Sequence, residues 1–94
     1  MLSLPQMKIK VEYEIRKIGE EEVLVSHKGN STNLSRLMVL NPSAAFLIRE
    51  TGDRSFDAKK WGEMLVERYG VESSRAESDA EQLIAKLKRE KVIE

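Results

Sequence analysis

Few side chains in this sequence are of the types that carry out acid–base, nucleophilic or metal chemistry. The 94 residues include one histidine, His27, and no cysteine. A catalytic or metal-binding histidine needs further ligands or a partner base, and the sequence has no second histidine, thiol or HExxH pattern. His27 precedes a polar stretch, where a lone histidine is most simply a surface residue. The lack of cysteine also excludes disulfides and thiolate-bound zinc or iron–sulfur clusters.

The other candidates for chemistry have simple structural explanations. The acidic run at residues 20–22 is typical of a solvated turn. Asp79 has no obvious partner in the sequence and suits the early part of a helix, where acidic residues complement the helix dipole. No phosphate-binding loop is present, because the glycines stand apart, as at Gly29, Gly52 and Gly70. The sequence therefore predicts no enzyme activity and no cofactor or metal of its own.

The charge balance bears on the kind of partner that the protein binds. Lys plus Arg and Asp plus Glu number 16 each, so the formal net charge is zero. Nonspecific binding to nucleic acid requires an excess of positive charge to displace counterions. No apolar run approaches the ~20 residues of a membrane helix, and the first residues lack the apolar stretch of a secretory signal. We therefore expect a cytoplasmic protein that binds neither nucleic acid nor membrane.

The first half of the chain has the patterns of three β-strands. Apolar and polar residues alternate over residues 7–15, as in a half-buried strand. A turn is predicted at residues 19–21, and residues 23–25 form a second run rich in β-branched side chains. Residues 28–33 have the composition of a loop, and residues 34–40 form the third strand candidate. Three short strands in series predict an antiparallel meander.

The second half carries the start and stop signals of helices. Residues 41–42 combine an Asn N-cap with Pro at the first helical position, and Gly52 ends that helix. Asp57 is the next predicted N-cap. Phe56 and Trp61 flank it at the spacing of a hydrophobic staple, which places Trp61 in the core.

Two further helix faces follow from the spacing of apolar residues. The second helix is predicted to end at Gly70 in a left-handed cap, with an apolar face of Trp61, Met64, Leu65 and Tyr69. The third helix is predicted to begin at Ser74, because residues 74–77 have the spacing of a capping box. The apolar stripe of the third helix consists of Ala76, Ala80, Leu83, Ile84 and Leu87.

Three strands followed by three helices predict an α+β fold, with the helices covering one face of a three-stranded antiparallel sheet. A winged-helix-like arrangement with a three-helix bundle is the natural small version of this fold. A length of 94 residues fits one domain. We expect residues 11–94 to form that domain and residues 1–10 to form a flexible N-terminal extension.

Several short segments, in this order, carry a resemblance to a known family. They are Tyr13-Glu14-Ile15-Arg16, Val23-Leu24-Val25, Leu40-Asn41-Pro42-Ser43-Ala44-Ala45, Glu67-Arg68-Tyr69-Gly70-Val71, and Asp79 with Leu83, Leu87 and Val92-Ile93-Glu94. Over residues 11–94 the chain resembles the coenzyme PQQ synthesis protein D family, whose PqqD-like domains are also called precursor-peptide recognition elements. Many members have a glycine soon after the Leu-Asn pair, where this chain has Ser43 and Ala44.

The resemblance implies a non-catalytic adaptor in cofactor or peptide natural-product biosynthesis. Such domains bind the leader of a ribosomal precursor peptide as an added strand beside the third strand, facing the third helix. They present it to a modifying enzyme, commonly a radical SAM protein. An edge strand without Pro or Lys is compatible with this mode. Lys88 would face an acidic leader residue at the rim. The peptide-binding residues expected here are Arg36, Leu37, Met38, Val39, Leu40, Ala80, Leu83, Ile84, Leu87 and Lys88.

Two other functions are open at this point. A winged-helix protein can place a helix in the DNA major groove, although the acidic Glu77, Asp79 and Glu81 at the start of the third helix would repel phosphates. A scaffold subunit could dock on an enzyme without touching the substrate. The apolar residues of the third helix also have an alternative, because Leu83 and Leu87 can be ordinary core residues.

Overall fold

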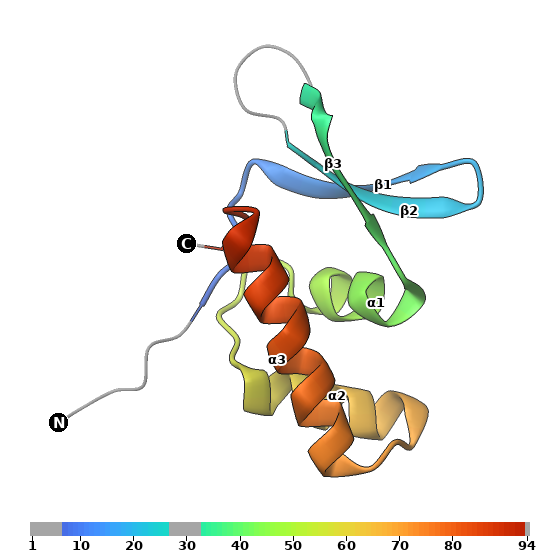
Figure 1. Ribbon diagram of the computed structural model, residues 1–94, viewed down its shortest axis with the longest axis vertical. Helices are drawn as coiled ribbons and strands as arrows, with labels where there is room; N and C mark the ends of the chain where they lie inside the picture. The colour runs from blue at the N-terminus through green and yellow to red at the C-terminus, as the bar shows by residue number, and fades with distance from the viewer. Residues whose placement is uncertain (1–6, 27–32, 94) are drawn as a thin grey trace, which may run out of the picture.

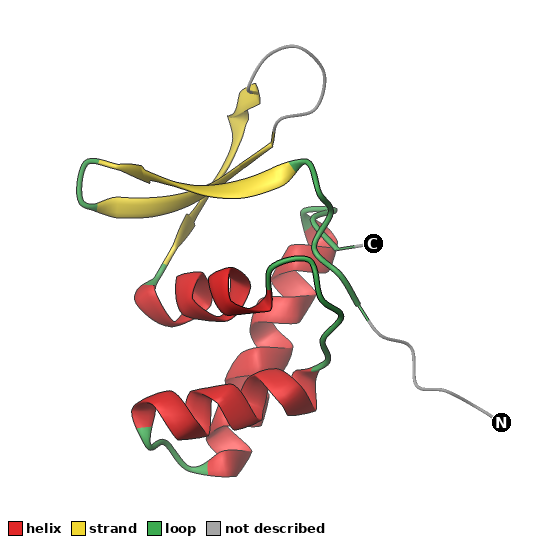
Figure 2. Ribbon diagram, turned by 180° about the vertical axis from the view of Figure 1, so that it is seen from behind, coloured by secondary structure: helices red, strands yellow, loops and turns green. Residues whose placement is uncertain are grey.

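The computed structural model describes residues 7–26 and 33–93, with the backbone alone for residues 33–37. The three strands form one antiparallel sheet in the order β1-β2-β3, and the three helices lie together on one side of it (Figures 1 and 2). This confirms the predicted α+β fold of three strands followed by three helices. The elements are β1 (Tyr13–Ile18), β2 (Glu21–Ser26), β3 (Asn33–Leu40), α1 (Pro42–Thr51), α2 (Ala58–Tyr69) and α3 (Ser73–Arg89).

The N-terminal residues do not extend β1, so the prediction of one strand over residues 7–15 is wrong. Met7 forms an isolated antiparallel bridge with Phe56, and Ile9 forms one with Ile93. A turn at residues 11–12 separates these bridges from β1. Ile9 is buried, but Val11 of the same alternating set is 88% exposed, because the chain changes direction after Ile9. The domain boundary at residue 11 stays a prediction.

The predicted helix ends are confirmed for α1 and α2. The Asn41 side chain accepts a hydrogen bond from the Ala44 N–H at 2.8 Å, and Asp57 accepts one from the Lys60 N–H at 2.7 Å. Each bond satisfies an N–H group that has no partner within the helix. Gly70 ends α2 in the left-handed conformation, with φ of 68°. These caps fix where the chain leaves β3 and where it turns between helices.

Trp61 lies at the centre of the helical layer, as the staple spacing predicts. Its side chain is fully buried and stacks on Phe56, with the ring centroids 4.1 Å apart. The indole Nε1–H donates to Thr51 Oγ1 at 2.8 Å, so the one polar atom of the ring is satisfied. Because Thr51 ends α1 and Trp61 belongs to α2, this contact ties the two helices together.

Two predicted details of the helices are wrong. Tyr69 is 44% exposed instead of completing the apolar face of α2, and its ring meets Phe46 edge-on with centroids 6.0 Å apart. The helix α3 begins at Ser73 and not at Ser74, and no side chain caps it. Ser74 already lies inside the helix, and its hydroxyl donates to the Glu72 carboxylate at 2.6 Å. It therefore cannot form a capping box.

The helices α2 and α3 touch through their backbones. A Cβ atom built on Gly62 of α2 would lie 3.1 Å from Cα and 3.2 Å from N of Glu77. Ala76, directly before Glu77, and Ala80 are small residues of α3 that are fully buried. Gly62 therefore permits a close approach that any larger residue would oppose.

The core position of Leu87 can be tested by truncation. Leu87 is fully buried, so Leu87→Ala removes apolar contacts and leaves a cavity, at a cost of about 2–5 kcal/mol in the free energy of unfolding. Urea titration followed by circular dichroism measures this change. Leu83→Ala is the matched control, because Leu83 is only half-buried and should cost clearly less. Equal losses for the two variants would contradict this packing.

The close approach of α2 and α3 gives a second prediction. In an exposed helix, Gly→Ala stabilises by about 1 kcal/mol. Gly62→Ala should instead lower the melting temperature, because the new methyl group would press on the backbone of Glu77. Differential scanning calorimetry is the measurement. A higher melting temperature for the variant would show that α2 and α3 are not in backbone contact at Gly62.

Candidate functional site

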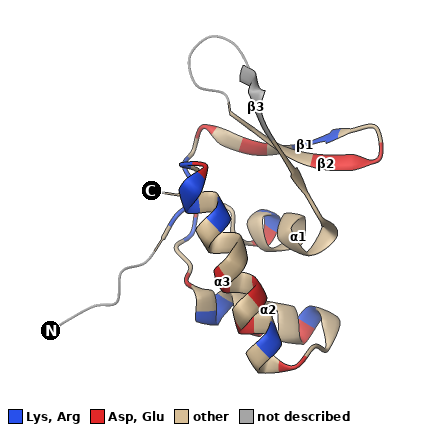
Figure 3. Cartoon of the chain, viewed as in Figure 1, with Lys and Arg blue, Asp and Glu red and all other residues tan. Residues whose placement is uncertain are grey.

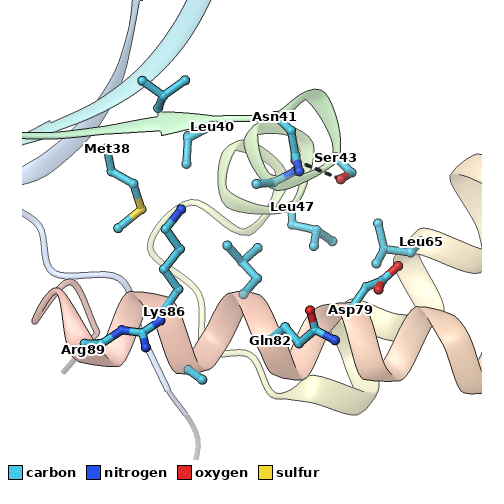
Figure 4. A pocket seen from close by; sticks show the side chains of 14 residues that line it. Met38, Leu40, Asn41, Ser43, Leu47, Leu65, Asp79, Gln82, Lys86 and Arg89 are labelled. Atoms are coloured by element: carbon cyan, nitrogen blue, oxygen red, sulfur yellow. Dashed lines mark hydrogen bonds between the residues drawn. The ribbon is translucent and has the colours of Figure 1, made fainter.

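A cleft of about 630 Å³ lies between β3 and α3 (Figure 4). One wall is the end of β3, and the other is one face of α3, while side chains of α1 and α2 also contribute to its lining. The apolar lining residues are Met38, Val39, Leu40, Ala44, Leu47, Leu65, Leu83 and Ala85. The polar lining residues are Asn41, Ser43, Asp79, Gln82, Lys86 and Arg89. A cleft of this size can hold several side chains of an extended ligand.

Part of the predicted site falls within this lining. Met38, Val39 and Leu40 of β3 line the cleft, as does Leu83 of α3. Met38 and Leu40 are buried and point into the cleft, whereas Val39 is 57% exposed. The structure does not describe the side chains of Arg36 and Leu37, and His27 lies outside the described residues.

The remaining predicted residues of α3 lie elsewhere. Ala80, Ile84 and Leu87 are buried in the core and do not line the cleft. Lys88 is exposed, but it is not among the lining residues either, so the structure does not place it at the rim. The positive charges beside the cleft come from Lys86 and Arg89.

The cleft-facing residues of α3 that the sequence prediction missed are mostly polar. Asp79, Gln82, Lys86 and Arg89 recur at intervals of three and four, together with Leu83, and so share one face of the helix. This face lies next to the apolar stripe of Ala80, Ile84 and Leu87 rather than on it. The pattern in the sequence that marks the cleft-facing side of α3 is therefore the polar stripe beside the apolar core stripe.

The turn between β1 and β2 determines which backbone groups of β3 are free. Gly19 and Glu20 connect the paired residues Ile18 and Glu21, and Gly19 has φ of 63°. A positive φ at the first turn residue alone is the pattern of a type II′ hairpin. The pair that closes a two-residue hairpin is hydrogen-bonded. Glu21 therefore bonds to β1, and the next residue along β2 bonds to the opposite side.

This alternation continues into β3. Glu22 and Leu24 direct their backbone groups toward β3, where their partners are Leu40 and Met38. The N–H and C=O of Val39, between these two residues, consequently point away from the sheet. Since no described strand lies beyond β3 on that side, these groups face the free edge beside the cleft.

Within residues 7–26 and 33–93, no group of three or more His, Cys, Asp or Glu side chains could hold a metal ion. Over the same residues, no helix has the length and apolar character needed to cross a membrane. A ligand in the cleft could form backbone hydrogen bonds with β3, apolar contacts with the lining, and ion pairs with its acidic and basic side chains.

Comparison with known proteins gives one finding. A family model described as coenzyme PQQ synthesis protein D (PqqD) matches residues 21–93. No curated protein and no solved structure matches the chain. The matched residues run from the start of β2 through the end of α3, so they include both walls of the cleft. With most of its length covered by that model, the chain belongs to the coenzyme PQQ synthesis protein D (PqqD) family.

Proposed function

We propose that this protein binds an extended peptide as an added strand on the free edge of β3 and presents it to a modifying enzyme. The observation that carries the proposal is the outward-facing backbone of Val39 at the mouth of a cleft lined by both apolar and polar side chains. An unpaired strand edge binds a peptide through main-chain hydrogen bonds, and a neighbouring groove receives alternate side chains. The two features lie side by side here.

The directions of the side chains on β3 are compatible with an added strand. Met38 and Leu40 are buried, whereas Val39 between them is 57% exposed, as expected for alternating side chains on a strand. On an added strand, every second side chain would point toward α3, as Met38 and Leu40 do. Leu83 and Leu47 would then meet those side chains inside the cleft.

Membership of the PqqD family supports a role in the synthesis of coenzyme PQQ or of a related peptide-derived product. In this proposal the bound peptide is the leader of a ribosomal precursor. The modifying enzyme, such as a radical SAM protein, supplies the chemistry. The adaptor raises the local concentration of the peptide at that enzyme, and the strand edge keeps the peptide extended.

The charge distribution disfavours DNA as the ligand. The exposed side chains in the first half of α3 include Glu77, Asp79 and Glu81, with Glu72 just before the helix. Figure 3 shows acidic segments in the first half of α3 and basic segments gathered at its C-terminal end. The N-terminal end of a recognition helix is the part that meets the bases in helix-turn-helix proteins, and here its acidic residues would repel the phosphates of a duplex.

Proline substitution tests strand addition at β3. Peptides for the test come from a display library of random 12-residue sequences selected on the unmodified protein. Val39→Pro should lower the affinity for the best peptide by about tenfold, because the N–H that proline removes would bond only to the peptide. The fold should stay intact for the same reason. Met38→Pro should instead damage the sheet, because the Met38 N–H faces Leu24 of β2. Calorimetry measures binding, and circular dichroism measures folding.

The matched control lies on the opposite edge of the sheet. By the same alternation, the Lys17 N–H of β1 points outward, so Lys17→Pro imposes a similar backbone change away from the cleft. This variant should bind the selected peptide as the unmodified protein does. If Val39→Pro stays folded and binds equally well, strand addition at β3 is wrong.

The proposal also predicts weak binding to DNA. Fluorescence anisotropy with a labelled random duplex at near-physiological salt should give a dissociation constant of about 100 μM or higher. This value is at the weak end of nonspecific binding. The result would follow from the zero net charge and the acidic start of α3. Sub-micromolar affinity with a steep dependence on salt would instead favour a winged-helix DNA-binding protein.

A further inference from the structure

The cleft between β3 and α3 carries opposite charges at its two ends. Lys86 and Arg89 lie at the end next to Met38, and Lys86 extends from α3 toward β3 (Figure 4). Asp79 lies at the other end, near Leu65 and the start of α1. Among the described side chains, none of these three charges takes part in an ion pair. The charges are therefore available to a ligand in the cleft.

We infer that the cleft selects peptides with a basic residue, an apolar residue two positions later and an acidic residue two positions after that. This inference rests on the proposed function, because it assumes that the ligand is a strand beside β3. The basic residue would pair with Asp79 and the acidic residue with Lys86 or Arg89. The apolar residue would lie between them, against Leu83.

The spacing follows from helix and strand geometry. Asp79 and Lys86 are seven residues apart, which is about 10.5 Å along a helix, and Asp79 and Arg89 are ten apart, or about 15 Å. A strand rises about 3.3 Å per residue, and only every second side chain faces the cleft. Cleft-facing residues four positions apart are separated by about 13 Å, between the two helix spans. A separation of two positions would be too short to reach both charged ends of the cleft, and a separation of six would be too long.

The order of the charges follows from the direction of the strands. In Figure 4, β3 runs from the Lys86 end of the cleft toward the Asp79 end. Antiparallel pairing is slightly more stable per residue than parallel pairing and is more common. The N-terminal part of an antiparallel peptide would thus lie near Asp79, and its C-terminal part would lie near Lys86. Its basic residue consequently comes first and its acidic residue second.

A focused peptide library tests this order. The display library consists of 11-residue peptides with threonine at the positions whose side chains would point away from the cleft. The three central positions that would face the cleft vary among Lys, Val and Glu. Selection on the unmodified protein should enrich Lys-Thr-Val-Thr-Glu over Glu-Thr-Val-Thr-Lys by about fivefold to tenfold, as expected for two partly exposed ion pairs. The ratio should fall as sodium chloride is raised, because salt screens such pairs.

Charge exchange in the protein provides the decisive comparison. The triple variant Asp79→Lys, Lys86→Glu, Arg89→Glu should reverse the preferred order, and circular dichroism should show an unchanged fold, because all three residues are exposed. Lys88→Glu is the matched control, since Lys88 is exposed but outside the cleft, and it should leave the order unchanged.

The outcomes separate the inference from the proposed function. Peptides that bind with no charge order, or with the same order on the triple variant, would overturn the inference and leave strand addition standing. Enrichment of the opposite order on the unmodified protein would overturn the antiparallel direction on which the inference depends. If the library and the random 12-residue library both yield no binding peptide, the proposed function fails and the inference fails with it.

Discussion

The helix α3 is fixed at its two ends, and the cleft depends on this arrangement. Near its N-terminus, α3 packs against α2 so closely that the Gly62 backbone meets that of Glu77. Just beyond its C-terminus, Ile93 pairs with Ile9, and the Lys10 N–H donates to the Val92 carbonyl at 2.9 Å. The core residues of α3 face inward between these anchors, and the adjacent face is left beside β3. The space between that face and the strand is the cleft.

The backbone groups exposed beside the cleft depend on the hydrogen-bonding pattern of the sheet. The two-residue turn at Gly19 sets the alternation of backbone hydrogen bonds in the β1–β2 hairpin, and pairing with β2 carries the alternation into β3. Val39 is the residue whose backbone groups end on the open side. A local feature of one turn thus determines which groups a ligand can reach about 20 residues later in the chain.

Most of the fold could be predicted from sequence because its signals are local. Asn41, Asp57 and Gly70 cap their helices in the predicted way, and the spacing of Phe56 and Trp61 correctly indicates a buried stack. The error at the first strand arises because a distant residue decides the outcome: Ile9 pairs with Ile93, which no local pattern indicates. The close approach at Gly62 likewise depends on Glu77 of the next helix, and no local pattern predicts it. The site prediction named the strand and the helix that border the cleft. It assigned the core stripe of α3 to the ligand, because periodicity alone does not say which side of a stripe borders a cleft.

Amide hydrogen exchange at Val39, followed by NMR, tests the central claim most directly. In the free protein the Val39 N–H should exchange rapidly, because no described residue pairs with it across the open edge, while the Met38 N–H should be protected by its pairing with β2. Addition of a saturating peptide from the selection should slow exchange at Val39 markedly and change Met38 little. A Val39 N–H that is already protected in the free protein, or that exchanges as rapidly with the peptide bound, would contradict strand addition at β3.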